Sequence, residues 1–198
     1  MPPIARWTLL SRSPTLARSS HCLSVSASGR ALLYGGELKP RTPVDADPDT
    51  TGSVHTFDIP DSLSTKRLGS WRTNSAVNPA TGPHPRVGAS STIVGDHLYV
   101  WGGRGGVDMA PITGAQAGVW RLPIAHIGKG HAPWERIQAM NEDESPLPRS
   151  YHTLTSVDVC WIYSSIFLAC LTALRSEGQI IYSRRLPRIR KAERATLV

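Results

Sequence analysis

Three tryptophans recur along the chain at nearly equal spacing, and an arginine follows each of them. The tryptophans lie 64 and 63 residues apart, at Trp7, Trp71 and Trp134. The arginines that follow them are Arg18, Arg86 and Arg149. Self-similarity at a long, fixed period is typical of folds built from stacked units, because each unit buries its apolar face against a neighbour. The chain is therefore expected to be a repeat structure.

Two of these units also continue alike after the arginine. An aromatic residue and two glycines follow, with the first glycine 17 residues after Arg18 and 16 after Arg86, as Tyr34-Gly35-Gly36 and Trp101-Gly102-Gly103. A further aromatic residue then stands 14 residues before the next tryptophan, as Phe57 and Trp120. One such glycine pair would be weak evidence of a repeat, but the duplication of the whole pattern is strong.

Each unit has the pattern of short antiparallel strands. Residues 20–26 and 89–94 alternate or are β-branched, and they precede turn sequences at 28–30 and 95–97. Residues 31–34 and 98–101 then form second strands that end in the glycine pairs, where positive φ and close backbone approach are easy. The sequence predicts an all-β fold of four-stranded units around a channel.

These residues, with Arg-x-x-His at 18–21 and 149–152, resemble kelch repeats. The pattern is most similar to galactose-oxidase-like fungal kelch proteins and to plant nitrile-specifier and thiocyanate-forming proteins. The resemblance implies an incomplete propeller over 6–158, with repeats at about 7–60, 71–124 and 134–158, which are two four-stranded blades and the start of a third. One departure is Ala89, where the other units have His21 and His152. An unfinished propeller would expose an open sheet face and associate.

The repeat pattern is lost after Asp158, and residues 159–198 form an aberrant tail. Residues 159–174 are uncharged, and a basic segment follows at 183–191. Three interpretations stay open. The first is a membrane anchor over 159–174, although this stretch is short for a span of about 20 residues. The second is a soluble helix that covers the unfinished blade. The third is translation of an unspliced intron, because codons available for Val159, Cys160 and Gln179 match intron boundary sequences. We favour the last.

The net charge of +7 does not predict a nucleic-acid partner. Residues 1–158 carry 15 basic and 13 acidic side chains, and 159–198 carry 7 and 2, so the charge belongs mainly to the tail. The N-terminus lacks an apolar run of signal-peptide length. Cys22, Cys160 and Cys170 form no C-x-x-C pair, which favours reduced thiols. We expect a cytoplasmic or nuclear protein.

No motif in the chain carries recognisable catalytic chemistry. The run 102–106 lacks the spacing and the lysine of a phosphate-binding loop, and His126 and His131 lack metal-ligand spacing. The acidic clusters at 45–49 and 142–144 are interpreted as solvated loops. We therefore predict no catalytic residue, metal or cofactor. Arg18, Arg86 and Arg149 are the candidate ligand-binding residues, either for an anion or as ties within each blade.

The predicted function is a non-catalytic kelch-repeat interaction module whose loops contact a protein partner. The alternative is a truncated, inactive relative of a specifier-like or oxidase-like kelch enzyme, because the blades that carry the metal ligands in those families are missing. The sequence favours a binding protein over an enzyme without deciding between them.

Overall fold

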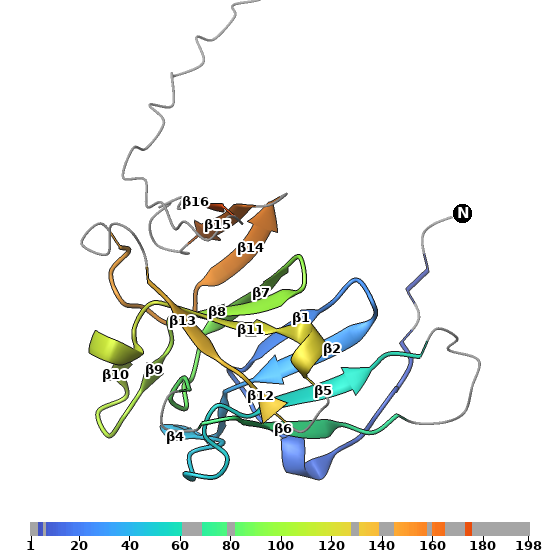
Figure 1. Ribbon diagram of the computed structural model, residues 1–198. Coiled ribbons are helices and arrows are strands. Elements are labelled where there is room, and N and C mark those ends of the chain that lie inside the picture. Colours follow the sequence, from blue (N-terminus) through green and yellow to red (C-terminus); the bar gives the residue numbers. More distant parts are fainter. Residues whose placement is uncertain are drawn as a thin grey trace, which may run out of the picture.

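A computed structural model describes residues 4–5, 7–60, 69–78, 82–127, 131–138, 145–157, 160–164 and 173–175. These residues form strands and three short 3-10 turns, η1 (Pro14–Leu16), η2 (Gly114–Gln116) and η3 (Ile124–His126), and no α-helix. The described part of the chain is thus all-β, as the sequence predicts (Figure 1).

The first sheet is an antiparallel meander. Its strands lie in the order β1 (Cys22–Val25), β2 (Arg30–Tyr34), β5 (Val54–Asp58) and β6 (Arg72–Ala76). The short β12 (His131–Ala132) adds to β6 in parallel. Loop residues between β2 and β5 form a small ribbon of β3 (Glu37–Lys39) and β4 (Thr42–Pro43).

The second sheet repeats this arrangement. Its strands lie in the order β7 (Ser90–Val94), β8 (His97–Trp101), β11 (Val119–Pro123) and β13 (Glu135–Ile137), with the ribbon of β9 (Arg104–Gly105) and β10 (Ala110–Pro111) between β8 and β11. A third sheet contains β14 (Thr153–Val157), β15 (Cys160–Ser164) and β16 (Ala173–Arg175). The predicted strands at 31–34 and 98–101, and the hairpin turns before them, are confirmed.

The sheets are offset from the sequence repeats. Trp71 and Trp134 stand just before β6 and β13, which are the fourth strands of the first and second sheets. Each tryptophan therefore closes a sheet, although in the sequence pattern it opens a repeat. Trp7 does not stand directly before a described strand. It is 95% exposed, so it neither closes a sheet nor packs between sheets.

The helical tail, one of the three interpretations left open by the sequence, is not found in the tail residues that the structure describes. β15 pairs with β14, and β16 pairs with β15, both antiparallel. Pairing between strands uses backbone groups alone, so a segment can join a sheet although the aromatic-Gly-Gly motif is missing. Residues 165–172 and 176–198, which hold half of the proposed anchor and the whole basic segment, lie outside the described residues. Among the described residues, no helix has the length and apolar character to cross a membrane.

The sheets stack face to face in chain order, and alternate residues of one strand contact two different neighbours. On β8, Leu98 and Val100 pack in a cluster with Leu32 and Tyr34 of the first sheet. Tyr99 and Trp101, on the opposite face, pack with Val119 and with Leu154 of the third sheet. The second sheet is thus covered on both faces, which accounts for the fully buried Leu98 and Val100.

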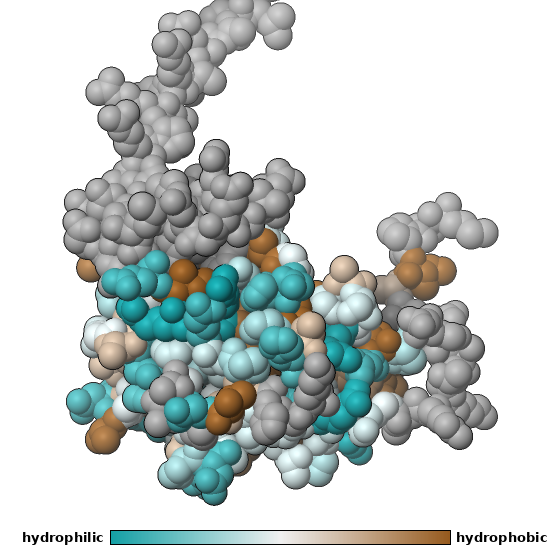
Figure 2. Space-filling model, viewed as in Figure 1, coloured by the Kyte–Doolittle hydropathy of each residue, from teal (hydrophilic) through white to brown (hydrophobic). Residues whose placement is uncertain are grey.

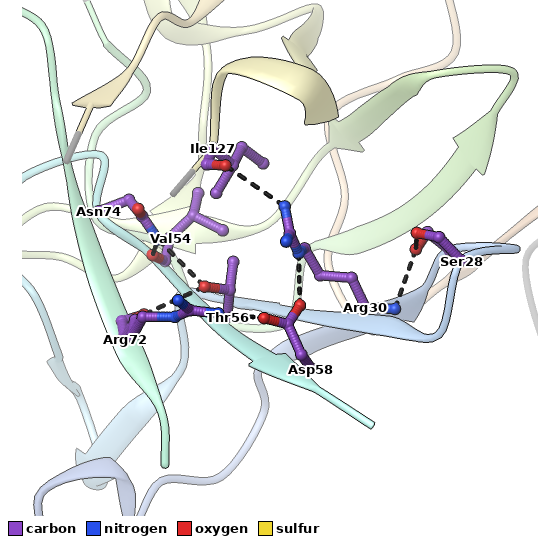
Figure 3. Close-up of polar contacts among 9 residues, drawn as sticks. Ser28, Arg30, Val54, Thr56, Asp58, Arg72, Asn74 and Ile127 are labelled. Atoms are coloured by element: carbon purple, nitrogen blue, oxygen red, sulfur yellow. Dashed lines mark hydrogen bonds and ion pairs between the residues drawn. The ribbon is translucent and has the colours of Figure 1, made fainter. Parts of the chain in front are cut away.

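Polar contacts also join the sheets. Ser24 and Ser91 share a hydroxyl–hydroxyl hydrogen bond of 2.7 Å, and the Ser90 hydroxyl donates to the carbonyl of His152. Figure 3 shows a surface cluster on the first sheet, where Asp58 accepts from Arg30 at 2.6 Å and also from Arg72. Arg30 reaches on to the carbonyl of Ile127 at 3.3 Å, which ties the first sheet to the segment after β11.

The described residues form no closed ring, and one face of the first sheet has no neighbouring sheet. Leu23 and Val25 of β1 point to that side and are 54% and 52% exposed. Their counterparts on β7, Ser91 and Ile93, face the first sheet and are half-buried. On the face seen in Figure 2, hydrophilic residues predominate and hydrophobic ones form small separate groups.

Gly35 is a site where close approach of two sheets requires glycine. Its φ is +66°, and a Cβ there would lie 2.6 Å from the carbonyl oxygen of Arg86. We expect Gly35→Ala to lower the free energy of unfolding by about 3 kcal/mol, because left-handed strain and a backbone clash add.

Gly106→Ala is the matched control, because Gly106 has φ +70° and its Cβ would meet nothing within 4 Å. It should cost about 1 kcal/mol, from backbone strain alone. Urea unfolding of both variants measures the difference; equal losses would show that the contact with Arg86 contributes nothing.

Candidate functional site

The three arginines lie at one end of the stacked sheets. Each precedes the first strand of a sheet, and the glycine pairs follow the second strands of the first two sheets. Because neighbouring strands run antiparallel, the start of the first strand and the end of the second meet at one edge. We call this the arginine end. Its described loop residues are 17–21, 35–53, 77–78, 82–89, 102–118 and 145–152, and its ribbons are β3–β4 and β9–β10 (Figure 1).

Each arginine side chain holds the loops of its own sheet. Arg18 donates from Nη1 to the Gly35 carbonyl at 3.2 Å, and Arg86 donates from Nη1 to the Gly102 carbonyl at 3.1 Å. Arg86 and Arg149 also donate from Nε to the carbonyl two residues earlier, at 3.1 and 2.9 Å. These contacts support the role of ties within each unit, which is one of the two roles predicted for these residues.

The backbone of the same residues links one sheet to the next. The amide of Gly36 donates to the Arg86 carbonyl at 2.9 Å, and that of Gly103 donates to the Arg149 carbonyl at 2.8 Å. A second chain of hydrogen bonds runs from Tyr151 to Gly88 at 2.7 Å and from Gly88 to Ser20 at 2.9 Å. These three residues are spaced alike from their arginines and all have positive φ, so the junction repeats from sheet to sheet.

The aromatic repeat residues fill the spaces between and beside the sheets. The rings of Tyr34 and Trp134 lie 5.3 Å apart, and those of Phe57 and Trp71 lie 5.4 Å apart. The indole N–H groups of Trp134 and Trp120 donate to the carbonyls of Gly52 and Gln116. Large rings thus bury apolar area while their polar atoms stay paired.

Asp45 is not the solvated loop carboxylate that its sequence context predicts. Its Oδ2 accepts from Arg18 at 2.8 Å and contacts His55 Nε2 at 3.1 Å. The Arg18 and Asp45 side chains are 3% and 16% exposed. Burial acts to raise the pKa of Asp45, but the hydrogen bonds from His55 and Arg18 outweigh it and hold that pKa below its usual value. No local motif reveals this contact, since β2 and the ribbon separate the two partners.

His152 is a second buried titratable group at this end. Its ring lies edge-on to Trp101 at 4.7 Å, and the residue is 6% exposed. Burial, with the nearby charge of Arg149, lowers the pKa of His152 to about 4. The imidazole is therefore neutral at physiological pH and packs as part of the interface between the second and third sheets.

Arg86 borders a cavity of about 340 Å³ at the arginine end. Trp101, Ile112, Gly114 and Leu147 contribute to its walls, and so does Arg136, which donates Nε–H to the Ala117 carbonyl at 2.7 Å. The sequence gives no signal for Arg136 or Gly114, because neither belongs to the repeated motif. Among the described residues, no group of three or more His, Cys, Asp or Glu side chains is placed to hold a metal ion.

Removal of the Asp45 charge should destabilise the fold. Asp45→Asn leaves the buried Arg18 guanidinium without a carboxylate, which costs about 3–5 kcal/mol in comparable buried pairs. The control is Asp58→Asn, because Asp58 also contacts two cationic side chains but is 44% exposed and should lose about 1 kcal/mol or less. Urea unfolding at pH 7 tests this difference, and a loss of under 1 kcal/mol for Asp45→Asn would contradict it.

The low pKa of His152 makes stability depend on pH. The unfolded chain binds a proton on this residue near pH 6.5 and the folded chain only near 4, so its contribution is lost as pH falls through that window. Between pH 7 and 4.5 the wild type should lose about 2–3 kcal/mol more than His152→Phe, whose ring does not titrate. Parallel pH dependence of the two unfolding free energies would refute this assignment.

The chain is similar in fold to proteins of known structure, although no family model and no curated protein sequence matches it. A structure of YjhT matches 79% of this chain, and a cryo-EM structure of RAG with one melted and one unmelted RSS matches 86%; each is 14% identical with a TM-score of 0.51. The matches cover only 36% and 50% of those two chains. At this identity the likeness concerns fold alone, and it fits an all-β sandwich- or propeller-like architecture.

Proposed function

We propose that this chain is part of a kelch-type β-propeller and acts as a non-catalytic protein-interaction module. The architecture is supported by three sheets stacked in chain order, with the same backbone junction at both interfaces. Successive four-stranded meanders packed face to face are what propeller blades require. The motifs that resemble kelch repeats, Tyr34-Gly35-Gly36 and Trp101-Gly102-Gly103, form this junction.

The observation that carries the interaction role is the exposure of apolar side chains at the arginine end. Five large hydrophobic residues there are at least half-exposed: Leu38, Val77, Val107, Leu147 and Tyr151. Arg104 lies over the Tyr151 ring at 5.1 Å. Tyrosine and arginine are among the residues enriched in protein-binding hot spots, and loops held by a rigid scaffold present this pair together with the exposed apolar side chains.

A protein partner fits these loops better than a nucleic acid. Arg18 at the arginine end, and Arg30 and Arg121 on the strands outside it, are each paired with a carboxylate within 2.8 Å. Arg86 is 1% exposed, so these four charges do not form a free basic face of the kind that binds phosphate backbones. We propose a cytoplasmic or nuclear location, because three cysteines without a C-x-x-C pair favour reduced thiols. The alternative role, an inactive relative of a kelch enzyme, would leave these loops without a partner.

Partner capture with a matched pair of variants tests the proposal. Val107→Asp with Leu147→Asp places two charges on the arginine end, at side chains 96% and 77% exposed, and should reduce capture of specific partners at least tenfold in quantitative crosslinking mass spectrometry. Leu9→Asp is the control, because Leu9 is 67% exposed but lies before β1, and it should capture the same proteins as wild type.

Two outcomes would overturn the interaction role. One is equal loss of captured proteins in both variants, which would indicate general stickiness. The other is metal-dependent turnover of a substrate by the full chain, which would favour the enzyme relative.

A further inference from the structure

The cavity at Arg86 lies beside a buried cation that has no carboxylate partner among the described residues. Arg86 is 1% exposed. Its guanidinium donates to the carbonyls of His84, Gly102 and Gln116 at 3.1, 3.1 and 3.4 Å. The described residues that line the cavity include no Asp or Glu, whereas Arg136 adds a second guanidinium. Carbonyl dipoles solvate the charge of Arg86 but do not neutralise it.

The first sheet shows how the same position is neutralised. Arg18 makes the contact equivalent to that of Arg86, with the first glycine of its own pair, and its charge is balanced by Asp45. The loops that follow the two glycine pairs correspond as far as Val44 and Ile112. The amide of Val44 donates to the Gly36 carbonyl and that of Ile112 to the Gly103 carbonyl, both at 3.0 Å.

The two loops then diverge in chemistry. The residue after Val44 is Asp45, with φ +53°, whereas Ile112 is followed by the exposed Thr113 and by Gly114, with φ +64°. The first sheet therefore has a carboxylate directly after the shared hydrogen bond, whereas the second has Thr113 there and then Gly114, which lines the cavity without a side chain. An unpaired buried charge is costly, and a charge-assisted hydrogen bond to an anion relieves that cost.

We propose that this cavity binds a carboxylate carried by a small apolar group. The carboxylate would pair with Arg86 and Arg136, and the apolar part would pack against Trp101, Ile112 and Leu147. A volume of about 340 Å³ lies at the small end of the range for ligand sites. The inference goes beyond the proposed function, because the group can belong to a free acid or to a glutamate side chain of a bound protein.

Calorimetry on the full chain, in buffer of low chloride at pH 7, provides the test. Benzoate represents a free acid and N-acetylglutamate amide represents a protein side chain. We expect at least one of them to bind, and its neutral counterpart, benzamide or N-acetylglutamine amide, to bind at least tenfold more weakly. Binding of benzoate alone identifies a free acid, and binding of the glutamate probe alone identifies a protein segment. Failure of both probes overturns the proposal.

Gly114→Asp offers a variant that blocks the site without removing a buried residue. A Cβ on Gly114 meets nothing within 4 Å, and aspartate tolerates positive φ, as Asp45 shows. The new carboxylate should compete for Arg86 and lower probe affinity at least tenfold, whereas Gly114→Asn should stay within threefold of wild type. Equal affinities of the two variants would refute the site.

Two further variants show where the carboxylate comes from and whether the site is independent of partner capture. Residues 142–144 are acidic and lie outside the described residues; probe binding that appears only in the Glu142→Gln, Asp143→Asn, Glu144→Gln variant would mean that the chain supplies its own carboxylate, which overturns the proposal. A Val77→Asp, Val107→Asp variant separates the two proposals, because both side chains are exposed at the arginine end and neither lines the cavity: normal probe binding with lost partner capture supports both roles, and retained capture with no probe binding leaves only the interaction module.

Discussion

Arg86 joins the first and second sheets through two contacts, one made by its backbone and one by its side chain. The backbone carbonyl of Arg86 accepts the Gly36 amide of the preceding sheet, while its side chain holds Gly102 of its own sheet. This double contact fixes the distance between two sheets and the position of the loops at once. The first glycine of the pair follows from it, because a Cβ at Gly35 would lie 2.6 Å from the Arg86 carbonyl oxygen. The second has a separate cause, because a Cβ at Gly36 would lie 2.5 Å from the carbonyl oxygen of Ser19 in its own unit. Apolar packing that includes Leu32, Tyr34, Leu98 and Val100 then buries further area between the sheets.

Burial of the Arg18 and Arg86 guanidinium groups costs free energy. The first and second sheets offset this cost differently. In the first sheet Asp45 neutralises Arg18, and His55 orients that carboxylate through its Nε2 contact. In the second sheet three carbonyls surround Arg86 and a cavity remains beside it. A structural tie and a ligand site are therefore compatible roles for one residue type, because geometry needs only some of the five guanidinium donors. A difference in one loop is thus enough to replace the Arg18–Asp45 ion pair of the first sheet with a cavity beside Arg86 in the second.

Much of the fold could be predicted because strand and turn signals are local. The turns at 28–30 and 95–97 and the strands that follow them have sequence patterns that short-range chemistry determines. The residues at which each sheet begins and ends could not be predicted. The spacing of Trp71 and Trp134 is the same whether each tryptophan stands in the first or in the last strand of a sheet. The strands after residue 158 could not be predicted either, because the loss of the repeat motif says nothing about backbone pairing, and β15 pairs with β14 through backbone groups. Of the candidate site, only the arginines have a repeated signal; Asp45, Arg136 and Gly114 acquire their roles from loops that fold back on them.

By itself, the sequence determined that the chain is all-β, that its units repeat, and that arginine and glycine pairs recur at fixed spacing, since periodicity and turn chemistry are properties of neighbouring residues. Only the tertiary structure decided which arginine has a carboxylate partner. Asp45 lies 27 positions from Arg18, and the two meet because the loop after β3 and β4 returns to the start of β1. Such contacts depend on the path of the chain in space, and no local pattern specifies whether a buried charge is paired or left facing a cavity.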